Sequence, residues 1–136
     1  MKHSFLVHTY YEDTDASGII YHANYLKFAE RARTEFLYQT GMTHNQLFDN
    51  DVMIVVARIE IDYKKPAFFE DELLVCTDIE SLGAASMVLS QIITKQDTII
   101  CTLKVHLAFI SKSSMRPVRI DAKLREKLLN YQNKGE

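Results

Sequence analysis

Hydrophobic and polar positions alternate along most of the second half of the chain. Four segments have this period of two: residues 52–65, 72–81, 85–94 and 98–110. Because successive side chains of a strand point to opposite faces, the pattern predicts strands with one buried face. In the last segment the apolar face carries Ile99, Cys101, Leu103, Val105, Leu107 and Phe109. The connections between the segments are short, which favours antiparallel pairing of the four strands.

The first third of the chain predicts one strand and one long helix. Residues 4–11 are rich in β-branched and aromatic side chains, which is typical of a strand. Residues 24–40 instead have apolar side chains at helical spacing, on Tyr25, Phe28, Ala29, Ala32 and Phe36. Asn24 or His22 is expected to cap the start of this helix, and Gly41 is expected to end it.

The C-terminal residues predict a short second helix. Asp121 is its expected N-cap, and Leu124, Leu128 and Tyr131 form its apolar stripe. The long helix needs an apolar partner, so it must lie on one face of the sheet. The predicted fold class is α+β, with an antiparallel sheet around a long central helix and a short C-terminal helix. We expect residues 1–136 to form a single domain, and the uncovered face of the sheet favours an oligomer.

Composition narrows the range of functions. The chain has 136 residues, 47% of them hydrophobic, and a net charge of −2, which disfavours a nucleic-acid binder. No apolar run reaches the roughly 18 residues that a membrane span requires, and the N-terminus does not resemble a signal peptide. Cys76 and Cys101 form neither a CxxC pair nor a zinc spacing. We therefore expect two reduced, buried thiols in a cytoplasmic protein.

An acidic loop is expected between the first strand and the long helix. Glu12, Asp13 and Asp15 fall within four residues, and His22 follows Asp15 by seven positions. One interpretation is a solvated loop whose carboxylates cap turns. The other is a reactive carboxylate beside a histidine, near a helix start whose free N–H groups stabilise a developing oxyanion. The second arrangement would suit acyl transfer, but the spacing alone leaves both interpretations open.

The stretch from Tyr10 to Leu37, YYEDTDASGIIYHANYLKFAERARTEFL, closely resembles the YbgC-like branch of the 4-hydroxybenzoyl-CoA thioesterase family. The motif D-T-D-x-x-G-x-x-Y-H-x-x-Y carries the resemblance, and the length and order of the remaining elements agree with it. The resemblance implies the hotdog fold, in which an antiparallel sheet wraps around a helix. It also implies an acyl-CoA thioesterase that hydrolyses a thioester to a free acid and CoA.

The resemblance assigns roles to residues of the motif. Asp15 matches the catalytic carboxylate and would act as nucleophile or as general base, two roles that remain open. His22 matches the second catalytic residue, whose side chain would orient substrate or water and whose backbone N–H would polarise the thioester carbonyl. Gly18, Tyr21 and Asn24 are expected to contact substrate: Gly18 through a tight backbone turn, Tyr21 as a pocket wall, and Asn24 besides acting as a cap.

The phosphates of coenzyme A call for basic residues at the rim of its site. Lys64 and Lys65 are the candidates, although many relatives carry a basic residue in the turn after the third strand, where this chain has Leu82-Gly83-Ala84-Ala85-Ser86. The acids near His22 lack the spacing of a metal site, so neither a metal nor a cofactor is expected. The resemblance implies a homodimer or homotetramer with active sites at the subunit interface.

Two alternatives to an acyl-CoA thioesterase stay open. One is hydrolysis of an acyl group carried by acyl carrier protein, which a basic docking patch would favour. The other, from a different class, is a non-catalytic module that binds an acyl group or a partner protein. An Asp15–His22 pair disfavours the second alternative, because binding alone does not require a carboxylate beside a helix N-terminus.

Overall fold

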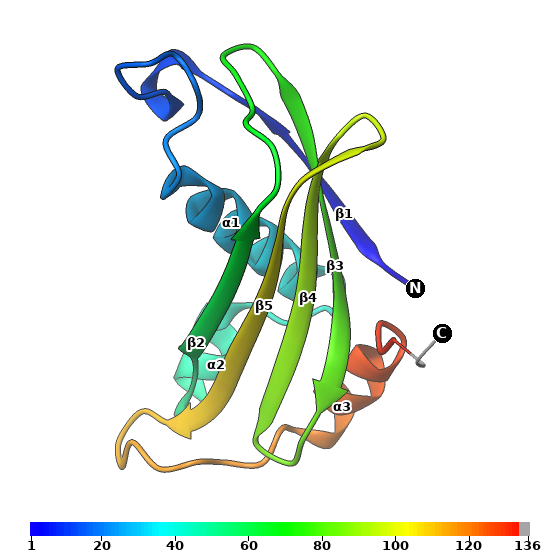
Figure 1. The fold of residues 1–136 in the computed structure, drawn as a ribbon. Helices are drawn as coiled ribbons and strands as arrows, with labels where there is room; N and C mark the ends of the chain where they lie inside the picture. Colours follow the sequence, from blue (N-terminus) through cyan, green and yellow to red (C-terminus); the bar gives the residue numbers. More distant parts are fainter. Residues whose placement is uncertain (134–136) are drawn as a thin grey trace.

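A computed structural model describes residues 1–133 of the chain. Its elements, in chain order, are β1 (His3–His8), the short 3-10 helix η1 (Tyr11–Asp13), α1 (Asn24–Gln39), α2 (His44–Asp49), β2 (Val52–Tyr63), β3 (Glu72–Leu82), β4 (Ser86–Lys95), β5 (Thr98–Ser111) and α3 (Ala122–Leu129). The strands form one sheet in the order β1-β3-β4-β5-β2, and every neighbouring pair is antiparallel (Figure 1). The predicted α+β architecture is confirmed.

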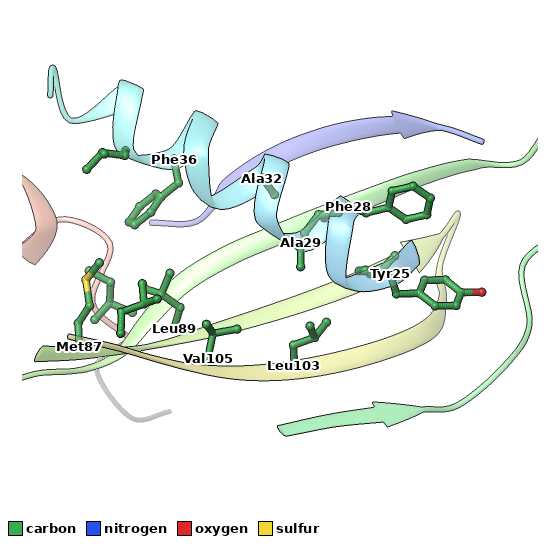
Figure 2. Packing of buried hydrophobic residues seen from close by; sticks show 14 of the residues in the cluster. Tyr25, Phe28, Ala29, Ala32, Phe36, Met87, Leu89, Leu103 and Val105 are labelled. Carbon is green, nitrogen blue, oxygen red and sulfur yellow. The ribbon is translucent and has the colours of Figure 1, made fainter. Parts of the chain in front are cut away.

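Helix α1 crosses one face of the curved sheet, and the main core lies between the two (Figures 1 and 2). The buried stripe of α1 consists of the five apolar residues predicted from the helical spacing, together with Asn24 and Leu37. Figure 2 shows this stripe facing inward-pointing side chains of β4 and β5, among them Met87, Leu89, Leu103 and Val105. Gly41 follows the helix with φ of +84°, as expected for a left-handed C-terminal position.

A polar contact fixes α1 on the centre of the sheet. The side-chain amide of Gln91 is fully buried and donates to the carbonyl of Ala29 (2.9 Å) and to Thr77 Oγ1 (3.0 Å). The carbonyl oxygen of the same amide accepts from Arg33 Nη1 at 3.1 Å. Since a buried polar group without partners is costly, these bonds favour one position of the helix along the strands.

Two predicted strands end earlier than expected. The first strand ends at His8 instead of residue 11, because Thr9 bonds to the loop before β3 and the chain then enters η1. The strand predicted over residues 52–65 ends at Tyr63. Beyond Tyr63, the N–H groups of Lys64 and Lys65 both donate to the carbonyl of Ile100, and the regular pairing of β2 with β5 ends there.

Bulges change which side chains face the core. A shift in pairing beside Thr94 breaks the alternation in β5, so Ile100 and Cys101 are both buried whereas Ile99 is 44% exposed. Ile99 was predicted on the inner face, and that prediction is wrong. A second bulge, between Val56 and Arg58, accompanies exposure of the middle of β2. The extra residue of a bulge reverses the facing of every side chain beyond it.

The C-terminal helix agrees with the sequence except at its end. Asp121 caps α3 by accepting from the N–H groups of Lys123 and Leu124. Leu124 and Leu128 are buried, but Tyr131 lies beyond the helix and packs edge-on against Phe36, with ring centroids 4.9 Å apart. Among residues 1–133, no helix combines the length and apolar character needed to cross a membrane.

The two cysteines should differ in reactivity. Cys101 is fully buried, and burial raises the pKa of its thiol to about 12, whereas Cys76 is half-buried near Ser4. Because the thiolate is the reactive form, iodoacetamide at pH 8 should label Cys76 and leave Cys101 unmodified. Intact mass should show one adduct on the native protein and two in urea. Native labelling that persists in Cys76→Ser would contradict the expected protection of Cys101.

Candidate active site

The candidate residues lie in the loop between β1 and α1, which is paired with itself and with the segment before β3. Thr14 pairs with Ile20 across a tight turn, and Ile19 pairs with Phe68 in the segment before β3. The carbonyl of Ala67 also accepts from the N–H of Ile20. The loop is therefore held as a small extension beside the sheet, at the end where α1 begins (Figure 1).

Asp13 is the internal brace of this loop. It is 5% exposed, and its carboxylate accepts from the N–H of Tyr10 (2.8 Å) and from Asn24 Nδ2 (2.9 Å). Its carbonyl accepts from the N–H of Tyr21. The expectation that Asn24 or His22 caps α1 is wrong: Ala23 is the N-cap and no side chain caps the helix, because the Asn24 amide is used on Asp13. The predicted contact of Asn24 with substrate stays a prediction.

Asn24→Ala should destabilise the fold by about 1.5–3 kcal/mol, since it leaves a buried carboxylate oxygen of Asp13 without its donor. The change in free energy is measured by urea unfolding at fixed protein concentration. Asn45→Ala provides a matched control, because Asn45 is an exposed residue of α2. Equal stability of the two variants would show that the contact between Asn24 and Asp13 contributes nothing.

Asp15 lies at the exposed tip of the tight turn. Its Oδ1 accepts from the N–H of Ser17 (2.8 Å) and from Ser17 Oγ (2.5 Å). The Asp15 carbonyl accepts from the N–H of Gly18, whose φ of +86° is the left-handed conformation expected at that position. The hydrogen bonds from Ser17 lower the pKa of Asp15, with a smaller contribution from the charge of His22, so the carboxylate is ionised at neutral pH.

His22 lies at the start of α1, between two tyrosine rings. The rings of Tyr21 and Tyr63 have centroids 4.6 Å and 6.2 Å from that of His22. Tyr63 Oη donates to the carbonyl of His22 at 2.9 Å and so ties the first turn of α1 to the end of β2. None of the hydrogen bonds found in residues 1–133 uses the N–H of His22 or Ala23. The helix start therefore offers free donors at its positive end.

The two predicted lysines lie near His22. Lys64 and Lys65 border a shallow depression of about 280 Å³ that is also lined by Ile19, Ile20, His22, Tyr25, Tyr63 and Pro66. Both lysines are exposed. The structure thus brings His22, Lys64 and Lys65 to one place, although the lysines follow His22 by more than forty positions.

Asp15 and His22 are not joined directly. Within residues 1–133, no hydrogen bond or ion pair connects them, and the same residues hold no cluster of three metal-ligating side chains. The arrangement is an exposed, ionised carboxylate close in sequence and structure to a helix start with free N–H groups. Such a carboxylate can attack a carbonyl carbon or activate a water molecule that attacks it. The backbone N–H donors can stabilise the negative charge that then develops on the carbonyl oxygen.

Sequence reasoning missed the roles of two residues here. Ser17 occupies an unspecified position of the D-T-D-x-x-G motif, although a serine two positions after an aspartate is a common turn partner. Tyr63 ends a segment that the sequence predicts as a half-buried strand, and the pattern gives no sign that its side chain is 47% exposed or that its hydroxyl contacts the start of α1. Only the fold brings Tyr63 and His22 together, so no local pattern could have identified that contact.

Comparisons with known proteins identify the family of the chain. The sequence model of the thioesterase-like superfamily matches residues 10–128. The acyl-CoA thioesterase YbgC of Haemophilus influenzae is 37% identical over 116 residues, which cover 85% of each chain, and that of Helicobacter pylori is 37% identical over 131 residues, covering 89% of this chain and 95% of the relative. A probable thioesterase from Bartonella henselae has a similar structure, with a TM-score of 0.84 and 34% identity over 89% of this chain and all of the other. The chain therefore belongs to the thioesterase-like superfamily, in its YbgC-like branch, and is a thioester hydrolase with the hotdog fold.

Proposed function

We propose that the protein hydrolyses acyl-CoA to a free acid and CoA, with Asp15 as nucleophile or general base. The observation that carries the proposal is the exposed, ionised carboxylate of Asp15 beside a helix start with unused N–H groups. Asp15 removes a proton from the water that attacks the thioester carbon, or it attacks that carbon itself; in the second case water then hydrolyses the acyl-Asp15 anhydride, which releases the free acid and restores the carboxylate. The N–H of His22 stabilises the carbonyl oxygen as it gains negative charge, and the thiolate of CoA leaves.

Coenzyme A is the proposed carrier of the acyl group. The relatives named acyl-CoA thioesterase support this choice, as do the two exposed lysines beside His22. Lys64 and Lys65 would contact phosphate groups, and Tyr21 and Gly18 would border the thioester. The single-domain organisation and the cytoplasmic location expected from the unpaired cysteines stay predictions.

A second copy of the chain would complete the site. Strand β2 is an edge of the sheet, and Val56 on it is 48% exposed. An unpaired edge strand is a template for pairing with another chain. Antiparallel pairing along the whole of β2 about a twofold axis places the Tyr63 end of one copy against the Val52 end of the other. The Asp15–His22 region of each subunit then adjoins the start of β2 in its partner.

An apolar cavity lies near the start of β2. It has a volume of about 190 Å³ and is lined mainly by α1, β2, β4 and β5, with Ile54, Val56, Phe36, Leu37, Met87, Leu89 and Leu107 as its apolar residues. An apolar cavity of about 150 Å³ can hold benzene. We propose that this cavity accommodates the acyl group of a thioester bound at the Asp15–His22 region of the partner subunit. Its small volume favours a short aliphatic chain or a single aromatic ring.

The test is release of free CoA from a panel of acyl-CoAs of increasing chain length, including one aromatic thioester. Short or aromatic acyl groups should give the highest kcat/KM, and Leu89→Phe should lower kcat/KM for the longer of these groups by filling the cavity. The same acyl groups on acyl carrier protein form a parallel arm. Hydrolysis only on the carrier protein would replace CoA as the proposed substrate, and hydrolysis of no thioester would refute the proposal.

A further inference from the structure

We propose that the Ser17 hydroxyl is a positioning group that fixes Asp15 so that Oδ2 is its reacting oxygen. The inference rests on the proposed function, since it takes Asp15 to be the reactive carboxylate. Ser17 lies two residues after Asp15 in an exposed turn, and within residues 1–133 the hydrogen bonds of its side chain and backbone N–H all end on Asp15. Its role would be exerted through Asp15 alone.

The contacts distinguish the two carboxylate oxygens. Oδ1 accepts twice from Ser17, from the backbone N–H and from the hydroxyl. None of the hydrogen bonds found in residues 1–133 uses Oδ2, although the backbone N–H of Asp15 itself also lowers the pKa of the carboxylate. An exposed aspartate would otherwise rotate between side-chain conformers, and two bonds to one oxygen select the conformer that leaves the other oxygen free. The free lone pairs of Oδ2 are then available to a substrate carbon or a water.

The Ser17 hydroxyl also lowers the pKa of the Asp15 carboxylate. Hydrogen bonds from Ser17 are the largest cause of the lowered pKa of Asp15, and the charge of His22 is a minor one. Of the other charged groups in this region, Asp13 points into the loop toward Asn24, Glu12 is exposed on η1, and Lys64 and Lys65 border the depression beside His22. None of these four is among the leading causes of the shift. Ser17 thus both orients the carboxylate and lowers its pKa.

Serine variants separate the hydroxyl from the backbone. Ser17→Ala keeps the N–H donor and the turn but loses the hydroxyl, and Ser17→Thr restores a hydroxyl at the same place. Ser17→Ala should lower kcat about tenfold, as expected for a loosely oriented catalytic group, with little change in KM. Ser17→Thr should recover most of the lost kcat.

A direct titration provides a readout that a merely structural role would not change. The carboxyl carbon of Asp15 is followed by NMR in protein labelled with ¹³C-aspartate, and its signal is identified by its absence from Asp15→Asn. The titration midpoint should rise in Ser17→Ala and return toward that of the wild type in Ser17→Thr. An unchanged midpoint, or an unchanged kcat, in Ser17→Ala would overturn the positioning role.

Two further outcomes separate this inference from the proposed function. If Asp15→Asn hydrolyses acyl-CoA as fast as the wild type, the proposed role of Asp15 fails, whatever the serine variants do. If Asp15→Asn is inactive and Ser17→Ala is equally inactive at wild-type stability, Ser17 takes part in the reaction directly and the positioning role is wrong. Thermal unfolding of each variant shows whether the loss of activity comes from unfolding.

Discussion

Asp15→Asn is expected to lower kcat/KM for thioester hydrolysis by about a thousandfold. General base and nucleophilic catalysis both require the negative charge and free lone pairs of the carboxylate, and removing such a group typically costs two to four orders of magnitude. The amide has nearly the same shape and can still accept from Ser17, so the turn should persist. Steady-state release of CoA from the best acyl-CoA measures the effect.

The loss should be specific to Asp15 among the acids of the loop. Glu12→Gln removes the same charge from an exposed residue of η1, three positions away, and should leave kcat/KM within about twofold of the wild type. Because the pKa of Asp15 lies below that of an ordinary aspartate, the wild-type rate should stay constant as the pH falls from 7 to 5. An Asp15→Asn variant retaining a tenth of the activity would exclude the carboxylate as the main catalytic group.

Phe28→Ala should have the largest effect on stability, about 3–5 kcal/mol. Phe28 is fully buried in the stripe of α1 and packs edge-on against Tyr25, with ring centroids 6.0 Å apart (Figure 2). Truncating it loses the burial of the ring and leaves a cavity between helix and sheet that the rigid strands cannot fill. Urea unfolding at fixed protein concentration measures the difference, since association with a second copy would add to apparent stability.

A control on the same helix isolates burial from helix propensity. Tyr38→Ala removes an aromatic ring that is 47% exposed and should change the free energy of unfolding by less than about 1 kcal/mol. A comparable loss in both variants would indicate that helix formation, and not core packing, accounts for the effect. Phe28→Ala should also lower activity near its unfolding midpoint, because the free N–H donors of His22 and Ala23 are held in place only while α1 is folded.

Local sequence patterns identified most of the elements of this fold. A run of helical spacing defined α1 to within one residue, and Asp121 marked the start of α3, because both signals arise from contacts within a few residues. Alternation located all four later strands. The pattern did not reveal the bulges beside Val56 and Thr94, since these depend on which strand lies opposite.

By itself, the sequence determined the family, the order of the five strands with α1 and α3, and Asp15 as the carboxylate to test. The D-T-D motif selected it over two neighbouring acids, and the structure adds that Asp13 is turned inward as a brace while Asp15 is exposed. Tertiary structure alone decided that Tyr63 holds the carbonyl of His22 and that Lys64 and Lys65 lie beside it. The physical reason is sequence separation: residues forty positions apart meet only because β2 returns along the sheet to the start of α1, and no local preference encodes that return.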